Sequence, residues 1–202
     1  AKKFYQTAIL LPYLMSMVVV AYLVYAFLST DTGLINNTII KGLLGKEEGI
    51  SWYTESAYWP FILTFVQQWK QIGFGMLLYL SSILGIDQAY YEAAMLDGAS
   101  KWQQIRKITI PLLKPTIIML VILNLGQVFR SDFGLFYQVP MNQGALYSVT
   151  QTIDTYVYRA LLVNNNLGMS AAASFLQSVV GFIFIVTANG IVRKMDSNSS
   201  LF

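Results

Sequence analysis

The side chains of this chain that could take part in chemistry gather in one polar interval, from Ile86 to Pro115, which lies between two apolar segments. The chain contains no Cys and no His. Thiolate and imidazole metal sites, Ser-His-Asp triads and cysteine nucleophiles are therefore excluded. We expect no metal site, and the interval must be understood from its acidic, basic and small residues.

The interval is predicted to form two short helices separated by a glycine turn. Asp87 occupies the N-cap position of a first helix that runs to Asp97, and Gly98 can adopt the left-handed conformation that ends it. Ser100 and Gln103 fit a capping box, which predicts that a second helix starts at once. The first helix has an apolar side (Ala89, Ala93, Ala94, Leu96), and the interval has basic flanks (Lys101, Arg106, Lys107, Lys114).

Two simpler interpretations exist for such an interval. Any cytoplasmic loop of a membrane protein can be helical and basic, with Gly98 serving only as a helix stop. A DNA-binding helix-turn-helix is the other, but an element tethered at both ends to membrane spans could hardly reach a major groove.

The residues at fixed spacing distinguish this interval from an arbitrary loop. They reproduce the pattern E-A-A-x3-G-x9-I-x-L-P, with Ile110 where Leu is usual. The matching residues are Glu92, Ala93, Ala94, Gly98, Ile108 and Pro111, with Asp97 next to the glycine. The interval closely resembles the signature loop of the membrane subunits of binding-protein-dependent ABC importers.

The resemblance extends over essentially the whole chain. Leu11-Pro12, Gly33-Leu-Ile-Asn36 and Ile153-Asp-Thr-Tyr156 are similar to carbohydrate permeases, particularly the branch that handles complex oligosaccharides. The resemblance implies that the 92–111 loop docks on a separate ATP-binding subunit. It also implies a second permease subunit, an extracytoplasmic solute-binding protein, no catalytic residue, no cofactor and no nucleic acid. Members of the family carry further helices upstream of Lys2, so we expect the chain to be N-terminally incomplete.

The composition independently indicates an integral membrane protein. Hydrophobic residues make up 55% of the chain and charged residues 11%, whereas about a quarter of the residues of a soluble domain are charged. Four transmembrane spans are predicted, at about 7–28, 59–84, 116–137 and 168–192, with the coupling loop at 86–115. Residues 29–58 are predicted to contain an interfacial helix, and residues 138–167 an external excursion with a helix from about Thr150 to Leu162.

Polar residues inside these spans are candidates for the substrate path. Lys70 lies near the middle of the second span, where a charge costs roughly 3 kcal/mol against lipid. Asn124, Gln127 and Arg130 form a polar stripe in the third span, and Phe133 is one of several aromatic residues at its far end. Polar side chains interleaved with flat rings suit a sugar, and two cations suit an acidic one. Equally, Lys70 can snorkel or be paired inside the bundle, and a polar stripe can join helices to one another.

The basic residues outside the spans predict the orientation. Most of them fall on the side of the coupling loop (Lys2, Lys3, Lys101, Arg106, Lys107, Lys114, Arg193, Lys194), and few on the other (Lys41, Lys46, Arg159). The positive-inside rule then places the loop in the cytoplasm.

We therefore predict one all-α transmembrane permease domain over residues 1–202. Such a domain would pass a carbohydrate across a bacterial cytoplasmic membrane in contact with membrane lipid. The alternatives are an ion-coupled secondary transporter and a structural membrane-assembly subunit. An ATPase that co-purifies through the coupling loop would favour the first function, whereas ion-driven uptake by the chain alone would favour the second.

Overall fold

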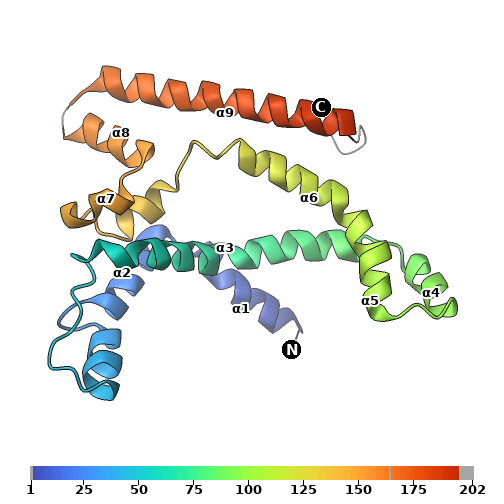
Figure 1. Cartoon of the computed structure of the whole chain (residues 1–202), viewed down its shortest axis with the longest axis horizontal. Helices are drawn as coiled ribbons and strands as arrows, with labels where there is room; N and C mark the ends of the chain where they lie inside the picture. The colour runs from blue at the N-terminus through green and yellow to red at the C-terminus, as the bar shows by residue number, and fades with distance from the viewer. Residues whose placement is uncertain (1, 164, 196–202) are drawn as a thin grey trace. The chain divides into compact units, whose positions relative to one another are not determined.

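The computed structural model describes residues 2–163 and 165–195, and in that part of the chain helices are joined by turns and loops (Figure 1). The α-helices are α1 (Lys2–Leu14), α2 (Met17–Leu28), α3 (Trp59–Leu84), α4 (Gln88–Leu96), α5 (Lys101–Gln104), α6 (Ile110–Leu125), α7 (Tyr147–Thr150), α8 (Ile153–Leu162) and α9 (Leu167–Met195). The π- and 3-10-helical segments are η1 (Ile35–Leu43), η2 (Ser56–Tyr58), η3 (Ile105–Thr109), η4 (Gly134–Gln138) and η5 (Gly144–Leu146). The all-α prediction is confirmed.

The helices group into two compact units. One unit comprises Ala1–Gly73 with Arg130–Phe175, and the other comprises Phe74–Phe129 with Leu176–Phe202. The long helices α3 and α9 each contribute residues to both units. The single permease domain remains a prediction, and the two units are described separately.

The first predicted span is not one straight helix. Residues 4–28 form α1 and α2, which are bent by 94° at a short break. Pro12 lies inside α1 and has no N–H for the helix ladder. Ser16 begins a new helix, since its side chain accepts a hydrogen bond from the Val19 N–H at 3.3 Å. The proline and the serine cap together explain why an apolar run that looks continuous in sequence is broken.

The second predicted span coincides with α3, which runs over residues 59–84. In the first unit this helix packs with α2 and η4 around a buried core (Val20, Ala21, Trp59, Leu63, Val66, Leu135, Val139, Leu146). Trp59 is fully buried, and its indole N–H donates to the Trp52 carbonyl at 2.6 Å. The core thus anchors the first half of α3.

The third predicted span, at about 116–137, begins and ends earlier along the chain in the structure. A continuous helical stretch, apolar enough to cross a membrane, covers Lys101–Leu125. It stops at Gly126, where α9 comes very close: a Cβ on Gly181 would lie 2.9 Å from the Gly126 oxygen. Gln177 then donates to the Phe129 carbonyl at 2.6 Å. One side chain of α9 thus pairs with the backbone beyond Gly126, where α6 has ended.

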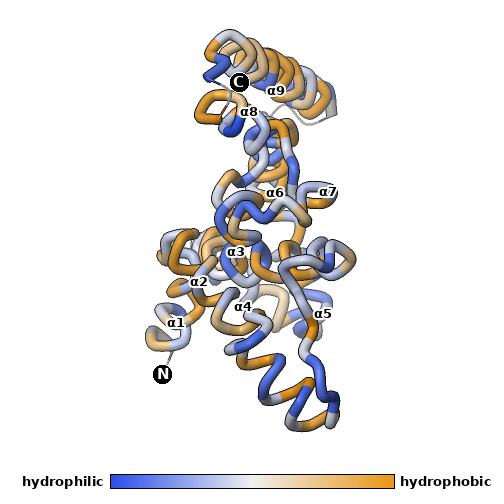
Figure 2. The backbone as a smooth tube through the Cα atoms, turned by 90° about the vertical axis from the view of Figure 1, so that its left-hand side faces the viewer, coloured by the Kyte–Doolittle hydropathy of each residue, from blue (hydrophilic) through white to orange (hydrophobic). Residues whose placement is uncertain are grey.

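The fourth predicted span corresponds to α9, which is mostly hydrophobic along its length (Figure 2). By length and composition alone, two helical stretches of the described chain could cross a membrane. The number rises to four if each of two bent pairs is one span, namely Phe4–Leu14 with Met17–Leu28 and Ser56–Leu84 with Gln88–Leu96.

Candidate functional site

The first helix of the predicted coupling loop is α4, which has a defined beginning and end. The Asp87 carboxylate accepts a hydrogen bond from the Ala89 N–H at 2.9 Å, which confirms the predicted N-cap. At the other end the Gly98 N–H donates to Met95 O at 3.0 Å and the Ala99 N–H donates to Ala94 O at 2.9 Å. These two bonds form a Schellman motif, which requires a left-handed residue. Gly98 supplies it with φ = +73°.

The second helix of the loop starts two residues later with the predicted capping box. The Ser100 N–H donates to the Gln103 side chain at 2.7 Å, and the Ser100 hydroxyl accepts from the Gln103 N–H at 3.4 Å. The helix passes through the π turn η3 just before Pro111. A π turn widens the helix where the proline cannot donate and its ring would crowd the preceding turn. Helical structure therefore continues from the loop into the apolar stretch that ends at Leu125.

One contact from α4 to η3 and one from α5 to the turn before it hold the helices of the loop together. The Tyr91 hydroxyl lies 2.9 Å from the Thr109 hydroxyl, and the Gln104 amide donates to the Ala99 carbonyl at 3.1 Å. A hollow of about 390 Å³ lies between them, lined by Ala94, Asp97, Gly98, Ala99, Gln103, Gln104, Lys107 and Ile108. The structure thus brings four of the predicted coupling residues (Ala94, Asp97, Gly98, Ile108) to one concave surface.

The outer surface of the helix pair exposes large apolar side chains. Leu96 is 90% exposed and Trp102 is 69% exposed, and Glu92 and Ala93 also face outward. Leu96 belongs to the predicted apolar side of α4. Trp102 comes from α5 and extends this exposed apolar surface. Exposed apolar groups beside charged ones are typical of a protein docking surface. Tyr91 and Thr109, which join the helices, are not part of the sequence motif and were not predicted.

The residues predicted to line a path are distributed over both units. Asn124 and Gln127 belong to the second unit, where the Asn124 amide donates to the Leu120 carbonyl of its own helix at 2.9 Å and Gln127 is exposed in the turn after α6. Lys70, Arg130 and Phe133 belong to the first unit. Because α6 ends at Leu125, Gln127 and Arg130 do not continue a polar stripe along this helix, which corrects the predicted helical periodicity.

Phe133 is part of an aromatic cluster with Tyr137 and Tyr158. Its ring stacks on Tyr137 with centroids 4.8 Å apart and an interplanar angle of 16°, and it lies 4.7 Å from the Tyr158 ring. Tyr137 and Tyr158 are 4.9 Å apart. All three side chains are partly exposed. The sequence indicated the first two rings but not Tyr158, which comes from α8.

A cation and several polar groups adjoin the aromatic cluster. Arg159, next to Tyr158 in sequence, lies over the Tyr147 ring at 4.2 Å and donates to the Asn142 side chain at 3.3 Å. Ser131 joins the segment before the cluster to the start of α8, since its N–H and its hydroxyl donate to the Asp154 carboxylate at 2.7 and 2.8 Å. This attachment places Phe133 and Tyr158 side by side.

Lys70 makes contacts that the sequence did not reveal. Its ammonium donates to the carbonyls of Pro12, Tyr13 and Met15 at 3.4, 2.9 and 2.7 Å and lies 5.7 Å from the centre of the Tyr13 ring. The Pro12 and Tyr13 carbonyls belong to the last turn of α1, and the Met15 carbonyl lies in the 94° break just after it. Of the two interpretations of Lys70, this geometry favours pairing inside the helix bundle.

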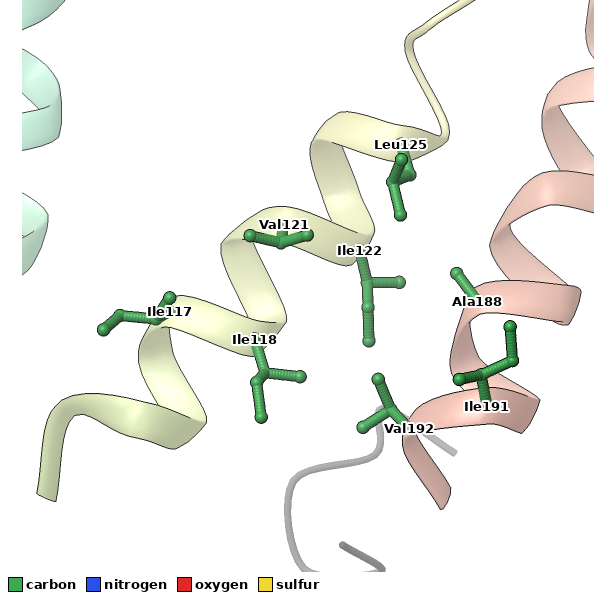
Figure 3. Close-up of a pocket in the computed structure, with 8 residues that line it drawn as sticks. All are labelled: Ile117, Ile118, Val121, Ile122, Leu125, Ala188, Ile191 and Val192. Atoms are coloured by element: carbon green, nitrogen blue, oxygen red, sulfur yellow. The ribbon is translucent and has the colours of Figure 1, made fainter. Parts of the chain in front are cut away.

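An apolar groove of about 250 Å³ lies between α6 and α9 in the second unit. Figure 3 shows Ile118 and Ile122 of α6 and Val192 of α9 pointing toward the same space. All the lining side chains are aliphatic (Ile117, Ile118, Val121, Ile122, Leu125, Ala188, Ile191, Val192). A carbohydrate needs polar partners, so this groove is not a candidate sugar site.

Comparison with known proteins places these features in context. The chain is 34% identical over 195 residues to Protein LplB of Bacillus subtilis (strain 168), covering 96% of this chain and 60% of the relative. It is also 34% identical over 194 residues to the polygalacturonan/rhamnogalacturonan transport system permease protein YteP of the same organism, covering 96% and 59%. The chain therefore spans about three fifths of the length of these curated relatives.

The fold resembles that of solved transporters. One chain in the crystal structure of a bacterial alginate ABC transporter, in complex with an alginate pentasaccharide-bound periplasmic protein, superimposes with a TM-score of 0.85 at 33% identity. The match covers 96% of this chain and 65% of that chain. The family model for the binding-protein-dependent transport system inner membrane component matches residues 1–197. With the signature spacing, the helical fold and this match in agreement, the chain belongs to the family of inner membrane components of binding-protein-dependent transport systems.

Proposed function

We propose that this chain forms part of the membrane permease of an ABC importer that carries a carbohydrate into the cell. A separate ATP-binding subunit docks on the 86–115 loop, and a second permease subunit and an extracytoplasmic binding protein complete the transporter. The observation that carries the proposal is the loop itself. Its motif residues form a capped helix pair with an exposed apolar surface and helical continuity into a span.

The substrate class that fits the first unit best is an acidic oligosaccharide. The rings of Phe133, Tyr137 and Tyr158 offer flat apolar faces for sugar rings. Arg130, which is exposed, and Arg159 supply positive charge for carboxylates. The substrates of relatives support this class, because one similar permease belongs to a polygalacturonan/rhamnogalacturonan transport system and one similar transporter imports the acidic polysaccharide alginate. Asn124 and Gln127, in the second unit, are proposed to contact hydroxyl groups of the carbohydrate.

The experiment measures ATP-driven uptake by the complete transporter in proteoliposomes. The binding protein is on the external side of the membrane, and ATP is on the side of the ATP-binding subunit. Tri-galacturonate and its fully methyl-esterified form serve as a charged and a neutral substrate with the same skeleton. We expect Tyr158→Ala to raise the KM for both forms and Arg130→Gln to raise it mainly for the charged form. Tyr158→Phe, which keeps the ring, is the matched control.

Two results would contradict this proposal. Uptake that continues without ATP but follows an ion gradient would favour a secondary transporter. Unchanged uptake and unchanged substrate range in Tyr158→Ala, Gln127→Ala and Arg130→Gln, at normal expression, would remove the path role and leave these polar residues as contacts between helices.

A further inference from the structure

The break between α1 and α2 leaves backbone carbonyls that need hydrogen-bond donors. The last carbonyls of any helix have no partner within it, and within a membrane they cannot be hydrated by lipid. They also carry the partial negative charge of the helix dipole. An ammonium group has three donors. Lys70 brings them to the carbonyls of Tyr13 and Met15 at 2.9 and 2.7 Å, and to that of Pro12 at 3.4 Å, which also accepts from the Met15 N–H.

A second contact fixes α3 against α1 beside this ammonium. Gly73, one turn after Lys70, faces the Ile9 carbonyl so closely that a Cβ at this position would overlap the carbonyl oxygen. Gly73 thus lets the backbones of α1 and α3 approach closely, and Lys70, on the same face of α3, bonds the end of α1. The geometry of the break depends on α3 rather than on α1 and α2 alone.

The helix after the break supports the aromatic cluster. Met17 is the first residue of α2, and it packs on Gly134, where a Cβ would lie 2.8 Å from the Met17 Cβ and Cγ. Gly134 begins η4, which carries Tyr137 and directly follows Phe133. A series of short contacts therefore runs from Lys70 through the break and Met17 to the ring pair.

We propose that Lys70 is a positioning residue: by closing the carbonyl end of α1 it fixes the direction of α2 and, through Met17 and Gly134, the placement of the Phe133–Tyr137–Tyr158 cluster. It contacts backbone and not substrate. The consequence for carbohydrate affinity rests on the function proposed above for the cluster. The effect of Lys70 on the geometry of the break does not depend on that proposed function.

The geometry is tested first, in the assembled transporter in membranes and without substrate. Residues 1–202 contain no Cys. With any cysteines elsewhere in the transporter replaced, a Met17→Cys, Gly134→Cys pair reports on the α2–η4 contact, after a shift of about 1 Å to reach disulfide distance. We expect Lys70→Met, which keeps the length and removes the charge, to lower the rate of disulfide formation severalfold. Lys70→Arg should retain part of the cross-linking rate. Gln71→Met, at an exposed neighbouring position, should leave the rate unchanged. An equal rate in Lys70→Met and the parent would overturn the positioning role.

Transport is measured next with the charged and the methyl-esterified tri-galacturonate in the transporter without cysteines. We expect Lys70→Met to raise the KM about tenfold for both substrates alike, which corresponds to 1.4 kcal/mol, with less effect on kcat. A rise confined to the charged substrate would overturn the proposal in favour of direct contact between Lys70 and a carboxylate. Slower cross-linking with unchanged KM would support the positioning role and refute the carbohydrate role of the cluster.

Discussion

Replacement of Gly98 by Val isolates the conformational requirement of the coupling loop. Gly98 has φ = +73°, a region that costs an L-residue about 1–2 kcal/mol and a β-branched residue more. Within the described chain, nothing lies within 4 Å of a Cβ built at this position. The whole intramolecular cost is therefore backbone strain, and 1–2 kcal/mol reduces the population of correctly turned loops by a factor of about 5–30.

The strain acts where the helix pair changes direction. Turning residue 98 away from positive φ breaks the two Schellman hydrogen bonds, Gly98 N–H to Met95 O and Ala99 N–H to Ala94 O. The helix that starts at Ser100 then points elsewhere relative to α4. We expect Gly98→Val to insert into the membrane normally but to lose ATPase-subunit association, or substrate-stimulated ATP hydrolysis, by a factor in that range.

The assay compares three variants of the complete transporter by co-purification of the ATPase, ATP hydrolysis and uptake. Gly98→Asn is the matched control, because Asn tolerates the left-handed region, and Gly98→Ala should be intermediate. If Gly98→Val assembles and transports like the parent, the reasoning from backbone conformation is refuted. If Asn is as defective as Val, the requirement is for space against the partner subunit and not for positive φ.

Two further predictions concern orientation and the external segment. We expect Ser100→Cys to be inaccessible and Glu47→Cys accessible to an impermeant thiol reagent added to intact cells; the opposite pattern would reverse the topology. Asn36 is fully buried, and its amide bonds Ser29 O, Thr30 O, Ile50 O and N–H, and the Trp52 indole. Asn36→Leu should leave several of these groups unpaired, at a cost of about 1–3 kcal/mol each, and should make residues 29–58 susceptible to trypsin added outside. Asn37→Leu, at an exposed neighbour, should not. Equal resistance of the two variants to trypsin would refute the anchoring role of Asn36.

The features that the sequence determined by itself are those set by neighbouring residues. The N-cap at Asp87, the left-handed Gly98 and the capping box at Ser100 depend on groups within a few positions of one another, so their residue types suffice to predict them. The apolar runs that became α3 and α9 are similarly local, because length and composition define them. The signature spacing, also a local property, identified the family.

Only the tertiary structure decided where the third span ends and how the carbonyls at the break in the first span are paired. The first is broken at a turn whose carbonyls are satisfied by Lys70, 58 residues from Pro12. The third ends at Gly126, beyond which Gln177, 48 residues away, bonds the Phe129 carbonyl. The same holds for the aromatic cluster, in which Tyr158 meets Phe133. A buried polar group has to be paired wherever a partner is available, and a partner distant in sequence leaves no periodic pattern around the residue that needs it.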